Sequence, residues 1–144
     1  MKIWDTSGQE KFQVITPSMY RNSKGIIIVF DLTNKKSFEK IHKWLTSIKL
    51  HTNPKNLAVF LLGNKADMWE ERVIDYEKAK DIADANNIEY YETSAISGEN
   101  VNKAFEEISR VAYEKTKSGL MKESFHLNNR KSFKRKMKAK QQCC

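Results

Sequence analysis

The chain has 144 residues, of which 40% are hydrophobic, so it is long enough for one compact domain with a short appendage. It contains no run of about 18 apolar residues and no basic region followed by an apolar segment at its start, so we expect neither a membrane-spanning helix nor a secretory signal. The net charge of +8 is uneven, because residues 120–144 carry eight Lys or Arg and one Glu. The remaining 18 basic and 17 acidic residues nearly cancel, so we expect no nucleic-acid surface on the folded part.

Four segments are predicted to be strands. The stretch Met1 to Trp4 resembles the end of a short strand, and a second short strand is expected at Ile88 to Tyr91. Gly25 to Phe30 (GIIIVF) and Ala58 to Leu62 (AVFLL) are continuous apolar runs without polar alternation. Such runs are typical of strands that are buried on both faces of a parallel sheet.

Three helices are predicted between and after these strands. Apolar residues three and four positions apart indicate a helix within Ser37 to Leu50. A second helix is expected from an N-cap at Asp75 to the pair Asn86-Asn87, and a third after an N-cap at Asn100. The apolar face of the third helix would consist of Val101, Ala104, Phe105, Ile108, Val111 and Ala112. Alternating strands and helices predict an α/β fold with a parallel sheet covered by helices.

The segment AVFLLGNKAD places polar side chains at the carboxyl end of a predicted central strand. We expect Gly63 to end this strand, so that Asn64, Lys65 and Asp67 lie in the crevice where open α/β sheets hold ligands. The Asp67 carboxylate can accept two parallel hydrogen bonds, which matches the ring N–H and exocyclic amine of guanine. Asn64 offers a donor and an acceptor, and the stem of Lys65 can lie along a flat ring. The alternative is an ordinary Asn-Lys loop with a solvated Asp.

Two further loops follow strands. In the segment Asp5 to Gln9 (DTSGQ), a glycine can bring backbone N–H groups close to an anion, and Asp5 can hold a metal ion or its water shell. The loop from Glu92 to Gly98 contains Thr93, Ser94 and Ala95 (TSA). For Thr93 and Ser94 the alternative role is ordinary helix and loop capping.

With these loops in this order, the sequence resembles the small GTPases, and specifically the Rab branch that directs vesicle traffic. The resemblance extends over the whole chain and rests on WDTSGQE, GIIIVFDLTN, LLGNKAD, ETSAISGENV and the terminal Cys-Cys. It implies GTP or GDP as ligand, with Mg²⁺. It also implies effectors, exchange and activating factors, and a prenylation escort protein as partners.

The resemblance assigns a role to each loop. Asp5 would hold Mg²⁺ through water, the Gly8 amide would meet the γ-phosphate, and Gln9 would orient the attacking water. Asn64 and Asp67 would read guanine while Lys65 flanks the base. Ser94 would brace that site, and the Ala95 amide would reach the guanine carbonyl oxygen. Ile96 stands where the family usually has a lysine.

The sequence lacks the phosphate-binding loop of this family. The motif G-x-x-x-x-G-K-[ST] cannot be formed from the five glycines, which are Gly8, Gly25, Gly63, Gly98 and Gly119. We therefore expect residues 1–116 to form an incomplete small-GTPase domain, a P-loop NTPase-like sheet without its first two strands and first helix. The absent phosphate loop predicts weak GTP binding, since base contacts alone leave the charge of a triphosphate unmatched. In the family's sheet the lost first strand would be central, so its absence leaves backbone groups unpaired and predicts low stability.

Residues 117–144 form a basic tail, which we expect to be disordered. A solvated charge run and a nuclear-targeting or nucleic-acid arm are alternatives. The final pair Cys143-Cys144 resembles the Rab signal for two geranylgeranyl chains, which together give stable anchoring. This implies a location on the cytoplasmic face of an intracellular membrane, with a cytosolic pool.

Three functional hypotheses follow. The first is a Rab-like GTP-binding switch whose GTP hydrolysis is impaired in this chain. The second is a non-catalytic, lipid-anchored interaction module. The third is a fragment from an incomplete gene model. Mg²⁺-dependent GTP turnover would separate the switch from the module.

Overall fold

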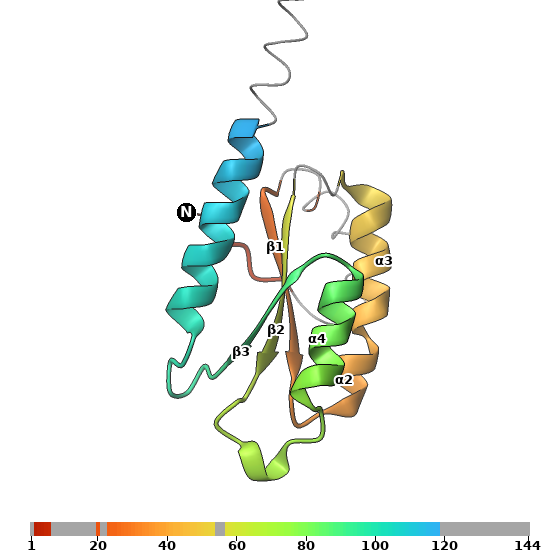
Figure 1. The fold of residues 1–144 in the computed structure, drawn as a ribbon, viewed down its shortest axis with the longest axis vertical. Helices are drawn as coiled ribbons and strands as arrows, with labels where there is room; N and C mark the ends of the chain where they lie inside the picture. Colours follow the sequence, from red (N-terminus) through yellow and green to blue (C-terminus); the bar gives the residue numbers. More distant parts are fainter. Residues whose placement is uncertain (1, 7–19, 21–22, 54–56, 119–144) are drawn as a thin grey trace, which may run out of the picture.

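The computed structural model describes residues 2–6, 20, 23–53 and 57–118. Within them, three parallel strands form one sheet in the order β1-β2-β3 (Figure 1). The strands are β1 (Gly25–Asp31), β2 (Ala58–Asn64) and β3 (Glu89–Thr93). The register aligns Asp31, Asn64 and Thr93, so all three strands end at the same level. The α/β class and the parallel sheet predicted from the sequence are confirmed.

Gly63 does not end its strand, contrary to the sequence prediction. It lies within β2 and is paired with Phe30 on one side and Glu92 on the other. A ladder on both sides holds a glycine in strand conformation although its intrinsic preference is weak. The consequence is that Asn64 is the last residue of β2 rather than a loop residue.

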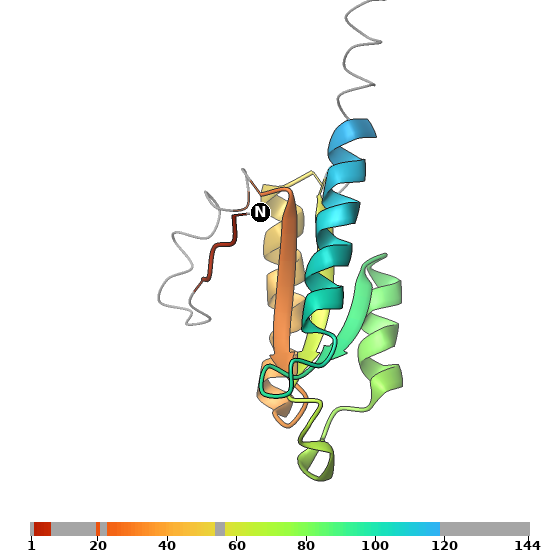
Figure 2. The same cartoon turned by 90° about the vertical axis from the view of Figure 1, so that its left-hand side faces the viewer.

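The prediction of a strand at Met1 to Trp4 is also wrong over residues 2–4, the part of this segment that the structure describes. Residues 2–6 have no regular secondary structure, and Ile3 and Trp4 are exposed. A strand is stable only when its backbone groups pair with a neighbour. The resemblance places a further strand between this segment and β1, and the described sheet offers no such neighbour. Figure 2 shows the segment lying beside β1 and outside the sheet.

The first predicted helix divides into α2 (Lys35–Glu39) and α3 (Ile41–His51). Between them the N–H of Lys40 donates to the carbonyl of Phe38, which interrupts the α-helical ladder. The side chain of Asn34 caps α2 by accepting from the N–H groups of Lys36 and Ser37. The apolar stripe is confirmed, because Phe38, Ile41, Leu45 and Ile48 are all buried.

The two later helices are also confirmed, although their caps differ from the prediction. Helix α4 (Tyr76–Ala85) follows Asp75, whose side chain makes no capping hydrogen bond, and a short 3-10 helix η3 (Trp69–Glu71) precedes it. The carboxyl-terminal helix is described over residues 101–118. Asn100 precedes it with a φ of 54° rather than the extended backbone typical of an N-cap, and its side-chain amide donates to the carbonyl of Glu92.

The helices cover both faces of the sheet. Helices α2, α3 and α4 lie on one face and the carboxyl-terminal helix lies on the other (Figures 1 and 2). The larger core cluster, which includes Phe30, Ile41, Leu61 and Tyr90, lies on the first side. On the second side Ile108 of the carboxyl-terminal helix packs against Ala58 and Phe60. This two-sided cover explains the continuous apolar sequence of β2.

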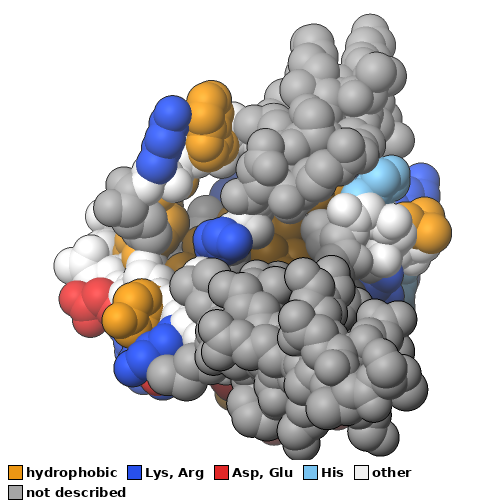
Figure 3. All heavy atoms as spheres, turned by 90° about the horizontal axis from the view of Figure 1, so that it is seen from above, with side chains coloured by type: hydrophobic (Ala, Val, Ile, Leu, Met, Phe, Trp, Pro, Cys, Tyr) orange, Lys and Arg blue, Asp and Glu red, His pale blue; other side chains and the backbone are white. Residues whose placement is uncertain are grey.

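The strand β1 is less buried than its apolar sequence predicts. Among the described residues it pairs only with β2, and Val29 is 59% exposed. Seen from the end of the sheet where the strands begin, hydrophobic side chains are visible deep in the middle of the molecule (Figure 3).

None of the described helices is long and apolar enough to cross a membrane.

Candidate functional site

The candidate site lies where the three strands end. Asp31, Asn64 and Thr93 are in register across this edge, and each leads into a loop. Two backbone bonds tie the loops to the strands: Leu32 N–H donates to the Asn64 carbonyl and Ala66 N–H donates to the Thr93 carbonyl, both at 3.0 Å. The edge therefore holds side chains from three separate segments at fixed positions.

The sequence-predicted residues Asn64 and Ala95 are in direct contact. The Asn64 side-chain oxygen accepts a hydrogen bond from the Ala95 N–H at 3.2 Å. Asn64 is partly buried and Ala95 is exposed, so this bond joins the end of β2 to the loop after β3. The structure therefore brings Asn64 and Ala95 together at the ends of β2 and β3.

Ser94 organises the loop that carries Ala95. It is fully buried, its N–H donates to the Glu99 carbonyl at 3.1 Å, and its hydroxyl accepts from the Ser97 N–H at 3.0 Å. The Gly98 N–H donates to the Ser94 carbonyl at 2.9 Å. Loop capping, which the sequence left as an alternative, is therefore a role that Ser94 has. This capping also fixes the position of the adjacent Ala95 amide.

Lys65 is held by an acidic residue that the sequence did not single out. Its ammonium lies 2.7 Å from the Asp31 carboxylate, and its backbone is left-handed with a φ of 69°. Asp31 also accepts from the N–H and the hydroxyl of Thr33, at 2.8 and 2.7 Å. Partial burial raises the pKa of Asp31, but the bonds to Lys65 and Thr33 outweigh it and leave that pKa below its ordinary value. Asp31 directly follows a predicted strand, and this was the signal that could have found it.

We expect Asp31→Asn to remove a pH-dependent part of the stability. Because the folded-state pKa is lowered, the contribution is fully present above the ordinary value of 3.8 and is lost as the pH falls through the folded-state pKa. The thermal midpoints of wild type and D31N, measured from pH 7 to pH 3, should converge at the acid end. A difference that stays constant with pH would contradict this interpretation of the ion pair.

The remaining predicted residues are not brought into this cluster. Asp67 is exposed in the loop after Lys65, and Ile96 is 86% exposed. Asp5 is exposed in residues 2–6, which lie beside the body of the sheet and not at the strand ends (Figures 1 and 2). Gly8, Gln9, Cys143 and Cys144 lie outside the described residues, as does the tail from residue 119.

The described part of the edge carries several polar groups close together. It presents the Asn64 amide, the Lys65 stem and the Ala95 N–H, while the Asp31 carboxylate is paired with Lys65 and Asp67 is exposed in the following loop. Amide, N–H and carboxylate groups of this kind can form hydrogen bonds with a purine base. Within residues 2–6, 20, 23–53 and 57–118, no group of three His, Cys, Asp or Glu side chains could hold a metal.

Comparison with known proteins identifies the family. The Ras family model matches residues 1–114, which is most of the chain. The chain belongs to the Ras family. The relatives that it matches include Rab proteins and YPT1, in agreement with the resemblance that the motifs indicated.

Three relatives illustrate this similarity. The chain is 46% identical to Ras-related protein Rab-10 of Diplobatis ommata over 116 residues, which are 81% of this chain and 58% of the relative. It is 46% identical to GTP-binding protein YPT1 of Saccharomyces cerevisiae over 110 residues, 76% of this chain and 53% of YPT1. Ras-related protein Rab-39A of Mus musculus is 40% identical over 119 residues, 83% of this chain and 55% of the relative. The chain thus spans little more than half the length of these relatives.

Proposed function

We propose that this chain is the guanine-recognising part of a Rab-type GTP-binding switch of vesicle traffic, and that these 144 residues alone bind GTP weakly or not at all. The observation that carries the proposal is the joined edge of Asn64, Lys65 and Ala95, with Asp67 exposed two positions after Lys65, in a sequence without a phosphate-binding loop. In this proposal Asn64 and Asp67 read the base, Lys65 flanks it, and Ser94 holds the Ala95 amide in place.

The phosphate side of the proposal depends on residues outside this edge. Gly8 would meet the γ-phosphate, Gln9 would orient water, and Asp5 would hold Mg²⁺ through water. Without backbone amides and a lysine around the phosphates, the charge of a triphosphate stays unmatched by the protein. Base contacts alone then supply most of the affinity, and GTP hydrolysis by this chain is impaired.

Titration with a fluorescent GTP analogue tests the proposal. We expect a dissociation constant on the order of 0.1–1 mM, because a base without phosphate contacts contributes only a few kcal/mol. Unlabelled guanosine should compete better than adenosine. Asp67→Ala should abolish this preference, whereas Asp75→Ala, which removes an exposed acidic side chain just before α4, should keep it.

Two results would contradict the proposal. Mg²⁺-dependent binding tighter than about 1 μM would mean that the phosphates are recognised after all. An unchanged guanosine preference in Asp67→Ala would show that the base lies elsewhere. Sequencing the transcript upstream of Met1 then tests the hypothesis of an incomplete gene model.

The second candidate function is a non-catalytic, lipid-anchored interaction module. It is favoured by the basic tail that ends in Cys143-Cys144, since two lipid chains give stable membrane residence and nearby Lys or Arg each add about 1 kcal/mol at an anionic surface. Its location would be the cytoplasmic face of an intracellular membrane, with a cytosolic pool and a prenylation escort protein as partner.

The intact mass of the membrane-bound protein from cells tests the lipid anchor. We expect two geranylgeranyl additions and their loss in Cys143→Ser/Cys144→Ser, together with release from the membrane. Unmodified cysteines on a membrane-bound population would contradict the anchor. Detectable Mg²⁺-dependent GTP turnover would favour the switch over the module.

A further inference from the structure

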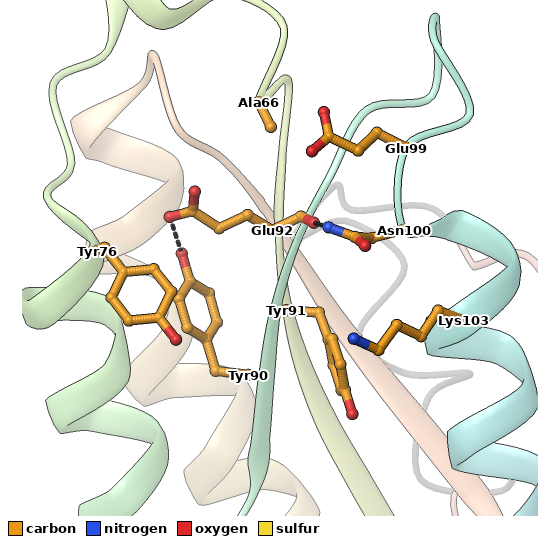
Figure 4. Close-up of a pocket in the computed structure, with 8 residues that line it drawn as sticks. All are labelled: Ala66, Tyr76, Tyr90, Tyr91, Glu92, Glu99, Asn100 and Lys103. Atoms are coloured by element: carbon orange, nitrogen blue, oxygen red, sulfur yellow. Dashed lines mark hydrogen bonds between the residues drawn. The ribbon is translucent and has the colours of Figure 1, made fainter.

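The outer edge of β3 is open in the described part of the fold. There β3 pairs only with β2, so its other side presents backbone N–H and C=O groups, of which the Glu92 carbonyl already accepts from the Asn100 side chain. A hollow of about 440 Å³ lies across this edge (Figure 4). An open strand edge beside a hollow is a site where an extended peptide can add main-chain hydrogen bonds and insert alternate side chains.

The side chains around the hollow are mainly aromatic and charged, and Lys103 is the basic residue among those that line it. Figure 4 shows Tyr76 and Tyr90 on the α4 side of β3, and Tyr91 with Lys103 on the other side. The ammonium of Lys103 lies 5.6 Å from the centre of the Tyr91 ring, so this ring already attracts a cation. Glu99 lines the hollow and is exposed. Glu92 also lines it, but Arg72 and Tyr90 already hold its carboxylate.

The charge of this part of the domain is opposite to that of the tail. Residues 66–99, which include α4 and β3, contain ten acidic and three basic residues, a net charge of −7. Residues 120–144 carry eight basic residues and one acidic residue, a net charge of +7. Two such segments of one chain attract each other over roughly 10 Å at moderate ionic strength.

We propose that the chain's own basic segment, residues 130–138 (RKSFKRKMK), docks in extended form along the open edge of β3. Phe133 would lie in the hollow beside the exposed Tyr76, on the α4 side of β3. The flanking Lys and Arg side chains would lie near Glu89 and Glu99. Residue 130 lies twelve positions after residue 118, and an extended chain of that length can span about 40 Å. That exceeds the length of the 18-residue carboxyl-terminal helix, about 27 Å, along which the tail would return.

Docking would couple this surface to membranes, because the same basic residues would bind anionic lipids. The proposal concerns an edge that needs no nucleotide, so its test is run without one and is independent of the proposed GTP site. Amide hydrogen exchange of the full chain, read by mass spectrometry, reports directly on the β3 backbone.

We expect peptides covering β3 to exchange about threefold or more faster in Lys131→Gln/Lys134→Gln/Lys136→Gln than in wild type, because the added strand no longer protects them. Raising the salt to about 0.5 M should have the same effect on wild type. The matched control, Lys35→Gln/Lys36→Gln/Lys43→Gln, removes three charges from α2 and α3 and should leave β3 unchanged. Peptides covering β2 serve as the internal reference for global stability. Equal β3 exchange in wild type and the tail variant would overturn the proposal.

Carbodiimide coupling identifies the occupant. In an equal mixture of ¹⁴N- and ¹⁵N-labelled chains, we expect links from tail lysines to Glu89 or Glu99, with both peptides carrying the same isotope. Links of mixed isotope would mean that a second copy occupies the edge, and links confined to other acidic residues would place the tail elsewhere. Either result would overturn the assignment of the chain's own segment to β3.

Discussion

Gly63→Val is expected to lower the free energy of unfolding by about 2–3 kcal/mol, because a side chain at this position enters occupied space. A Cβ atom there would lie 2.9 Å from Leu32 Cδ2, 2.9 Å from the Tyr90 hydroxyl and 3.1 Å from Phe30 Cζ. All three neighbours are buried, and the Tyr90 hydroxyl also donates to Glu92 at 2.8 Å. They can move away only by disturbing the core at the base of the candidate site.

Urea denaturation measures this loss, and two further variants separate its causes. Gly63→Ala adds the Cβ alone and should cost about 1–2 kcal/mol. Gly98 has nothing within 4 Å of its Cβ position but has a φ of +79°, so Gly98→Ala should cost about 1 kcal/mol through backbone conformation alone. If Gly63→Val were no more destabilising than Gly98→Ala, the space around Gly63 would not be limiting.

Much of the fold could be predicted from local sequence. The apolar runs at residues 25–30 and 58–62 and the stripe through Phe38, Ile41, Leu45 and Ile48 each match a described element. The prediction was wrong where pairing between strands determines which residues belong to a strand. Gly63 stays in β2 because neighbours hold both of its sides, and residues 2–4 are not a strand because no described neighbour pairs with them. Pairing partners lie far apart in the sequence, so propensity alone does not report them.

The candidate site was predictable in its positions but not in its contacts. Strand-end logic placed Asn64, Lys65 and Ala95 at one edge, and the Asn64 to Ala95 bond agrees with it. The ion pair of Lys65 with Asp31 needed the register of two strands, which the sequence does not state. The ion pair also orients the Lys65 stem beside the position proposed for the base. Asp31 of β1 therefore contributes to the site by positioning Lys65.

Arg72→Ala is expected to destabilise the domain by about 2 kcal/mol, although Arg72 lies outside the candidate site. The Arg72 guanidinium forms a bidentate ion pair with the Glu92 carboxylate. Its Nε donates to the Ile74 carbonyl at 2.6 Å. The side chains of Arg72 and Glu92 are 27% and 18% exposed, so alanine would leave a partly buried carboxylate without its cation. Their remaining exposure is why we expect less than the full cost of breaking a buried pair. Burial and the bond to Glu92 also raise the pKa of Tyr90, which keeps its hydroxyl protonated as a donor but does not replace the lost charge.

An ion pair on the surface of the domain provides the matched control. Lys80 forms an ion pair with Asp84 on the surface of α4, where their side chains are 37% and 60% exposed. Lys80→Ala should therefore cost no more than about 0.5 kcal/mol in the same urea experiment. Arg72→Met/Glu92→Met removes both charges and should recover part of the loss, because no unpaired carboxylate remains. Equal costs for Arg72→Ala and Lys80→Ala would mean that water reaches Glu92 as freely as it reaches Asp84, and the ion pair would then not hold the loop before α4 against β3.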